Sequence, residues 1–154
     1  MGTVMHILSR RDAVRLVVLA ASSTFSASIP LIAAETVPAA IKGYDPVAYF
    51  TLGHPMRGLP EIAYEWDEQR YLFSRAEHRA LFKADPVRYA PQFGNFCAMA
   101  LTRGELDEAN PEYWLISEGK LYIFNKPRGP DLFQRALAGN VVKANENRPL
   151  VLKH

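Results

Sequence analysis

The sequence predicts an α+β fold: a small single domain with short antiparallel hairpins and several helices. Three observations support this class. The 154 residues suit one domain and leave no room for two well-packed ones. Hydrophobic residues make up 49% and charged residues 22%, which is the composition of a globular protein. Two stretches alternate apolar and polar residues around tight turns, and segments with helical patterning follow each of them.

The charge balance and the cysteine count exclude several classes of protein. With 18 basic and 16 acidic residues the net charge is only +2, so we expect no nucleic-acid partner. Most of this small surplus lies in residues 1–34. The single cysteine, Cys97, excludes a disulfide within one chain and a metal cluster built from several cysteines.

Residues 1–34 are predicted to be an export signal peptide. The Arg10-Arg11 pair resembles a twin-arginine signal, and an apolar stretch, residues 16–34, follows it. Cleavage after Ala34 would leave residues 35–154 as the mature domain, periplasmic or otherwise exported. A general secretory route and an uncleaved membrane anchor remain alternatives, and the membrane is a partner only through this segment.

The first elements of the mature domain are a helical turn and a hairpin. Asp45 can cap a helical turn that starts at Pro46, where the missing N–H costs nothing. Residues 62–66 then alternate apolar and polar side chains, as a half-buried strand does. Residues 67–69 make the turn, and 71–73 form the returning strand.

A helix is expected after this hairpin. Ser74 is predicted to cap it, and Glu77, three residues later, completes a capping box. Asp85 and Pro86 end the helix and start another short turn. Residues 91–102 have the least regular pattern of the domain.

The last third of the domain is predicted to contain a second hairpin and a helical tail. Residues 113–117 and 120–124 have the composition of two strands around a tight turn. The tail, residues 130–148, is expected to form two helices separated by Gly139.

Several of these stretches resemble a known family. The matching residues are Gly43-Tyr44-Asp45-Pro46-Val47-Ala48-Tyr49-Phe50, Tyr71-Leu72-Phe73-Ser74, Phe82-Lys83-Ala84-Asp85-Pro86-Val87-Arg88-Tyr89-Ala90-Pro91 and Phe93-Gly94-Asn95-Phe96-Cys97-Ala98. Together they resemble the YHS-domain family, in its exported bacterial branch, over most of residues 41–105. The resemblance implies a YHS/TRASH-like α+β fold. YHS domains occur in heavy-metal transporting ATPases and in some hydroxylase components, so it also implies metal binding.

Metal-associated YHS domains carry cysteines at positions where this chain has other residues. One of these cysteines comes soon after the Asp-Pro-Val stretch, where this chain has Ala48. A Cys-x-x-x-Cys pair lies at the junction of strand and helix, where this chain has Ser74 and His78. These replacements favour a rival class, a structural or interaction module that has lost the metal site.

Cys97 is the principal candidate for a metal site. In an extended segment Cys97 and Met99 would lie on one face, and a thiolate with a thioether favours copper as Cu(I). His78 is the third candidate ligand, and zinc is the second candidate metal because Cys and His also suit it. The alternative is that Cys97 and Met99 fill space in the core.

The function expected from the sequence is therefore binding of a metal ion or another small ligand by an exported, non-catalytic domain. A thiol-dependent enzyme that pairs Cys97 with His78 is the least favoured class, because no accompanying catalytic motif is present. Packing in the core and against the sheets is expected for the many aromatic residues, which include Tyr44, Tyr49, Tyr64, Trp66, Tyr71, Phe73, Tyr89 and Trp114. Their alternative role is to line a pocket for a small ligand.

Overall fold

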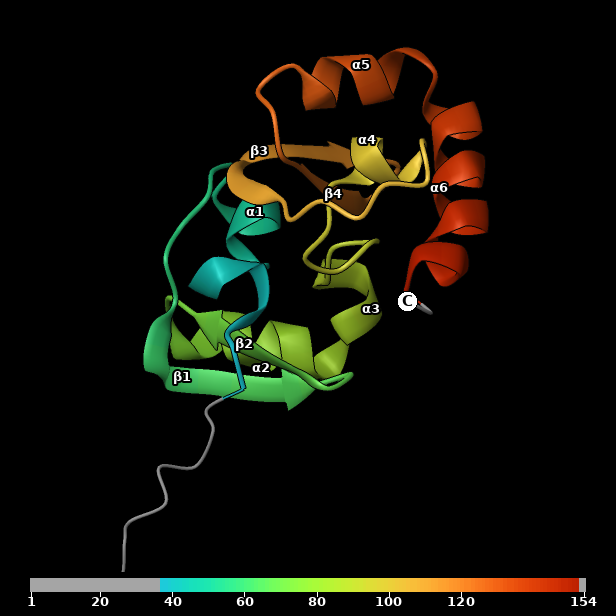
Figure 1. Cartoon of the computed structure of the whole chain (residues 1–154). Coiled ribbons are helices and arrows are strands. Elements are labelled where there is room, and N and C mark those ends of the chain that lie inside the picture. The colour runs from blue at the N-terminus through green and yellow to red at the C-terminus, as the bar shows by residue number, and fades with distance from the viewer. Residues whose placement is uncertain (1–36, 153–154) are drawn as a thin grey trace, which may run out of the picture. The chain divides into compact units, whose positions relative to one another are not determined.

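Two antiparallel hairpins, each packed against helices, form the fold of residues 37–152, the part of the chain that the computed structural model describes (Figure 1). The elements in chain order are η1 (Ala40–Gly43), α1 (Ala48–Thr51), β1 (Leu59–Trp66), β2 (Gln69–Phe73), α2 (Ala76–Ala84), α3 (Pro86–Tyr89), α4 (Ala98–Leu101), β3 (Asn110–Ser117), β4 (Lys120–Phe124), α5 (Gly129–Arg135) and α6 (Leu137–Val151). This arrangement confirms the predicted α+β class. The predicted export signal, residues 1–34, lies outside the described residues.

The first hairpin has a tighter turn than the sequence pattern predicts. Trp66 pairs directly with Gln69, so only Asp67 and Glu68 form the loop and Gln69 belongs to β2. The strand β1 also starts earlier than predicted, at Leu59, because Leu59 already pairs with Phe73 of β2. The register of the two strands is irregular between Leu59 and Ala63.

The second hairpin matches its prediction closely at β4 and separates two hydrophobic cores. Side chains of a strand alternate between its faces. Leu121 and Ile123 of β4 belong to the core under the first hairpin, whereas Tyr122 and Phe124 belong to the core under the C-terminal helices. All four are buried, so both faces of β4 are covered by protein.

The two cores have different surroundings. The first is built around β2, α2 and η1, with Phe82 of α2 among the rings of the first hairpin. The second lies where α4, α5 and α6 meet β4. In Figure 1 the first hairpin with α2 and the second hairpin with α5 lie at opposite ends of the view, and α6 runs beside α4.

The helical tail breaks at a different residue from the one predicted. Ala136 has a non-helical backbone and separates α5 from α6, whereas Gly139 lies inside α6. The side chain of Asn140 explains this, since its Nδ2 donates to the carbonyl oxygen of Phe133 (3.0 Å) at the end of α5. None of the helices in residues 37–152 is long and apolar enough to cross a membrane.

Candidate functional site

Asp45 lies at the centre of a buried polar cluster that joins α1 to α2. Its side chain is fully buried, and its Oδ1 accepts hydrogen bonds from the backbone N–H groups of Val47 (2.9 Å) and Ala48 (3.3 Å). N–H groups at the start of a helical turn have no earlier carbonyl to bind. Asp45 therefore caps the turn that follows it, as predicted, although α1 itself begins only at Ala48, with Val47 at its N-cap.

The second oxygen of this carboxylate binds the junction of β2 and α2. Oδ2 of Asp45 accepts from the backbone N–H (2.8 Å) and the hydroxyl (2.7 Å) of Ser74, and it contacts Nδ1 of His78 at 2.6 Å. The predicted capping box of Ser74 and Glu77 is wrong. Arg75 occupies the N-cap of α2 and no side chain caps that helix, because the Ser74 hydroxyl is bound to Asp45.

His78 has protein partners on both ring nitrogens. A carboxylate only accepts hydrogen bonds, so the contact with Asp45 places a proton on Nδ1. Nε2 lies 3.0 Å from the hydroxyl of Thr51, the last residue of α1. The imidazole is only 4% exposed. A metal ion could bind His78 only by displacing one of these two contacts.

Cys97 belongs to the second core and caps a short helix. Its side chain is 1% exposed, and its Sγ accepts from the backbone N–H of Ala100 at 3.4 Å. The thiol also donates to Oδ1 of Asn125 at 3.2 Å, and Asn125 in turn donates to the Asp107 carboxylate at 2.9 Å. The sulfur is thus partly satisfied by hydrogen bonds within the protein.

The expected geometry of Cys97 and Met99 is not the observed one. The helix α4 begins at Ala98, so Met99 is helical and the rule of alternating strand faces does not apply. Met99 is half-buried and packs against the second core, while His78 bonds to Asp45 beside the first. Within residues 37–152 no group of three His, Cys, Asp or Glu side chains is placed to hold a metal ion.

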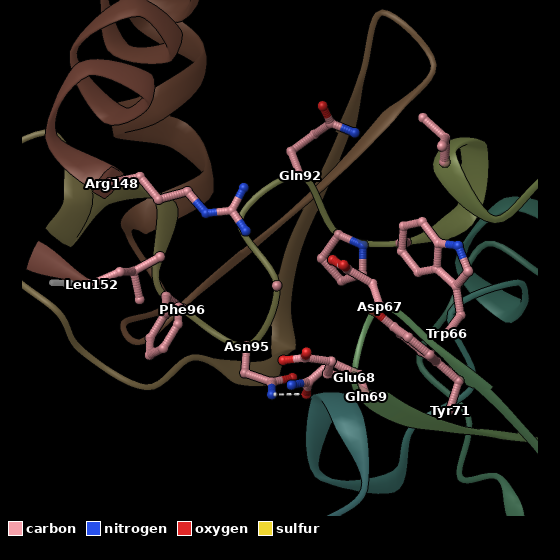
Figure 2. Close-up of a pocket in the computed structure, with 14 residues that line it drawn as sticks. Trp66, Asp67, Glu68, Gln69, Tyr71, Gln92, Asn95, Phe96, Arg148 and Leu152 are labelled. Atoms are coloured by element: carbon pink, nitrogen blue, oxygen red, sulfur yellow. Dashed lines mark hydrogen bonds between the residues drawn. The ribbon is translucent and has the colours of Figure 1, made fainter. Parts of the chain in front are cut away.

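A cavity lies elsewhere, between the β1–β2 turn, the segment that follows α3 and the end of α6. Its volume is about 580 Å³. The residues that line it are Trp66, Asp67, Glu68, Gln69, Tyr71, Val87, Ala90, Pro91, Gln92, Gly94, Asn95, Phe96, Arg148 and Leu152. Figure 2 shows that they come from both ends of the domain, with Arg148 and Leu152 on one side of the view and Trp66 and Tyr71 on the other.

The turn that forms one wall of this cavity has an unusual backbone. Asp67 (φ 50°) and Glu68 (φ 57°) are both left-handed. Two-residue hairpin turns need this conformation and favour Asn-Gly, because in other residues the Cβ atom crowds the following carbonyl oxygen. Such strain, about 1–3 kcal/mol for each residue, clusters at binding sites and switches. Here it places two carboxylates at the rim of the cavity.

An amide pair fixes this wall to the rest of the domain. Nδ2 of Asn95 donates to Oε1 of Gln69 at 2.9 Å, and both residues line the cavity (Figure 2). Oδ1 of Asn95 accepts from the backbone N–H of Ile41 at 2.6 Å. Ile41 is buried and also left-handed (φ 51°), so this bond helps to hold a backbone conformation that a β-branched residue disfavours.

The titration of Tyr71 reports the charges around the cavity. The pKa of its phenol is raised to about 12, mainly by burial and to a smaller extent by the Asp67 carboxylate, while Arg148 lowers it. Asp67 and Arg148 therefore act on the same buried hydroxyl, although 81 positions separate them in the sequence. Sequence reasoning named Trp66 and Tyr71 as alternative pocket residues but missed Asn95, Gln92 and Arg148. No local pattern marks these three, because only the fold brings them together.

Comparison with known proteins yields no relative: no family model, no curated protein and no solved structure matches this chain. The class of protein is therefore described from its fold and site. It is a small α+β domain with two cores, a buried Asp–His cluster and a cavity lined by aromatic, amide and charged side chains.

Proposed function

We propose that this chain is an exported, non-catalytic domain of the YHS type that binds a small polar molecule in its cavity. The observation that carries the proposal is the cavity lining, which combines ring faces, amides and charged groups around about 580 Å³. Small-ligand sites are typically concave, about 300–1,000 Å³ in volume, with apolar walls and a few polar groups that orient the ligand.

The export part of the proposal rests on residues 1–34. The Arg10-Arg11 pair and the apolar stretch after it favour transport out of the cytoplasm. A periplasmic domain that binds a small molecule reversibly needs no reactive residue, and neither His78 nor Cys97 lines the cavity.

The YHS resemblance implies a metal site at the position of the Asp45 cluster. The hydrogen bonds of this cluster favour a structural role without a metal there. The three positions at which metal-associated YHS domains carry cysteine are Ala48, Ser74 and His78. All three bind the Asp45 carboxylate, through a backbone N–H, a hydroxyl and an imidazole respectively. Protein hydrogen bonds thus occupy the donors and acceptors at this place, which favours a structural role for it.

A fragment screen by two-dimensional amide NMR tests the proposal on the purified chain. We expect binders to shift the side-chain amides of Gln69 and Asn95 and the indole of Trp66, because all three line the cavity. Gln92→Trp adds a bulky side chain to the lining and should weaken binding by about tenfold or more.

The matched control is Lys143→Trp, which adds the same bulk at an exposed residue of α6 outside the lining. It should leave the affinity unchanged. Fragments that shift only residues distant from the cavity, or that bind Gln92→Trp as well as the original chain, would show that this cavity is not the binding site.

Copper binding by Cys97, with Met99 and His78 as helpers, is the sequence-based alternative to this proposal and has its own test. From its burial we expect Cys97→Ala to lower the free energy of unfolding by about 1–3 kcal/mol through lost packing. We expect this substitution to leave Cu(I) uptake, measured against a chromogenic chelator, as it was. Uptake of one Cu(I) per chain that disappears in Cys97→Ala would instead support a metal centre.

A further inference from the structure

Charged side chains of both signs line the cavity without partners in the described protein. Asp67 and Glu68 stand on the β1–β2 turn and Arg148 on α6 (Figure 2). None of the three takes part in an ion pair within residues 37–152. Arg148 and Asp67 therefore lie around one space without neutralising each other.

The unpaired charges limit the ligands that fit. A ligand that enters the cavity removes water from the groups it touches, and a charge left without water or a partner is costly. Arg148 is half-buried, so a purely cationic ligand would desolvate and repel it. The two carboxylates of the turn are exposed, and they would repel a purely anionic ligand at the rim of the cavity. A ligand with both charges avoids both costs.

The aromatic residues define the rest of the ligand. Trp66 and Asp67 both line the cavity, and a tryptophan ring and a carboxylate each attract an ammonium group. Phe96 and the buried Tyr71 supply apolar surface in the same lining. Asp67 and Arg148 line the same cavity, so a single ligand in it can face both opposite charges.

We propose that the cavity binds a zwitterionic small molecule with an apolar body. Its ammonium group lies against Asp67 and Trp66, and its carboxylate binds the guanidinium of Arg148, which suits carboxylates because its N–H groups form a planar fork. This inference rests on the proposed function and specifies its ligand class.

Three probes that share one phenylethyl frame test the inference by NMR titration. L-phenylalanine carries both charges, phenethylamine only the ammonium group and 3-phenylpropionate only the carboxylate. We expect L-phenylalanine to bind about tenfold or more tightly than either of the others. Asp67→Asn should weaken L-phenylalanine and phenethylamine but not 3-phenylpropionate, and Arg148→Gln should weaken L-phenylalanine and 3-phenylpropionate but not phenethylamine.

The same two substitutions at exposed residues of α5, Asp131→Asn and Arg135→Gln, are the controls and should change no affinity. Unfolding midpoints show whether each variant is folded. Phenethylamine that binds as tightly as L-phenylalanine would overturn the inference in favour of a cation site. Fragments that bind in the cavity while L-phenylalanine does not would overturn it and leave the proposed function standing. A cavity that binds nothing would overturn both.

Discussion

Replacing Asp45 with alanine will lower the free energy of unfolding by about 3–5 kcal/mol, because it leaves the partners of a buried charge unpaired. The carboxylate accepts five hydrogen bonds, from two N–H groups of the α1 turn, from the N–H and hydroxyl of Ser74, and from His78. Each buried donor left without a partner carries its own desolvation cost. Urea unfolding followed by circular dichroism measures the effect.

Asp85→Ala is the matched control for Asp45. Asp85 is exposed and caps α3 through a single bond to the N–H of Arg88 (3.2 Å), so its loss should cost only about 0.5–2 kcal/mol. A double-mutant cycle between Asp45 and His78 isolates their mutual interaction. If Asp45→Ala costs no more than Asp85→Ala, the cluster does not stabilise the junction of α1 and α2 as argued.

Phe82→Ala is expected to be comparably damaging, with a loss of about 3–5 kcal/mol from lost burial and the cavity left behind. Phe82 is fully buried, and its ring centroid lies 4.6 Å from that of Tyr71, 5.3 Å from Phe73 and 6.0 Å from Trp66. These rings leave little room for the chain to collapse into the gap. Thermal and urea unfolding measure the loss.

The same experiments provide a further test, because Trp66 and Tyr71 also line the cavity. We expect Phe82→Ala to weaken ligand binding as well as stability, since it removes the support behind that wall. Val142→Ala is the control: Val142 is 54% exposed and lies outside the cavity lining, so the change should leave binding as it was and stay within about 0.5 kcal/mol in stability. A stable Phe82→Ala variant would mean that the aromatic cluster repacks freely.

The elements of this domain could be predicted where local chemistry is decisive. Alternation of side chains located both hairpins, and the capping preference of Asp45 located the turn at α1. The predictions for Ser74 and Gly139 failed because side-chain hydrogen bonds decide the local structure. Asp45, distant in the sequence, binds the Ser74 hydroxyl, and Asn140, next to Gly139, donates to the carbonyl oxygen of Phe133.

The candidate sites show the same difference between what residue type predicts and what the fold determines. Sequence reasoning singled out Cys97 and His78 by residue type, but residue type does not give a distance, and the two have separate partners in the fold. The cavity could not be predicted, because its walls come from β1–β2, the segment after α3 and α6.

The sequence by itself determined the α+β class, the two hairpins and the capping role of Asp45, because side-chain periodicity and turn chemistry act between near neighbours. Only the tertiary structure decided which polar groups are paired and which are left facing a common space. Such an arrangement depends on residues far apart in the chain, such as Asp67 and Arg148, and these line one space only once the two cores have formed.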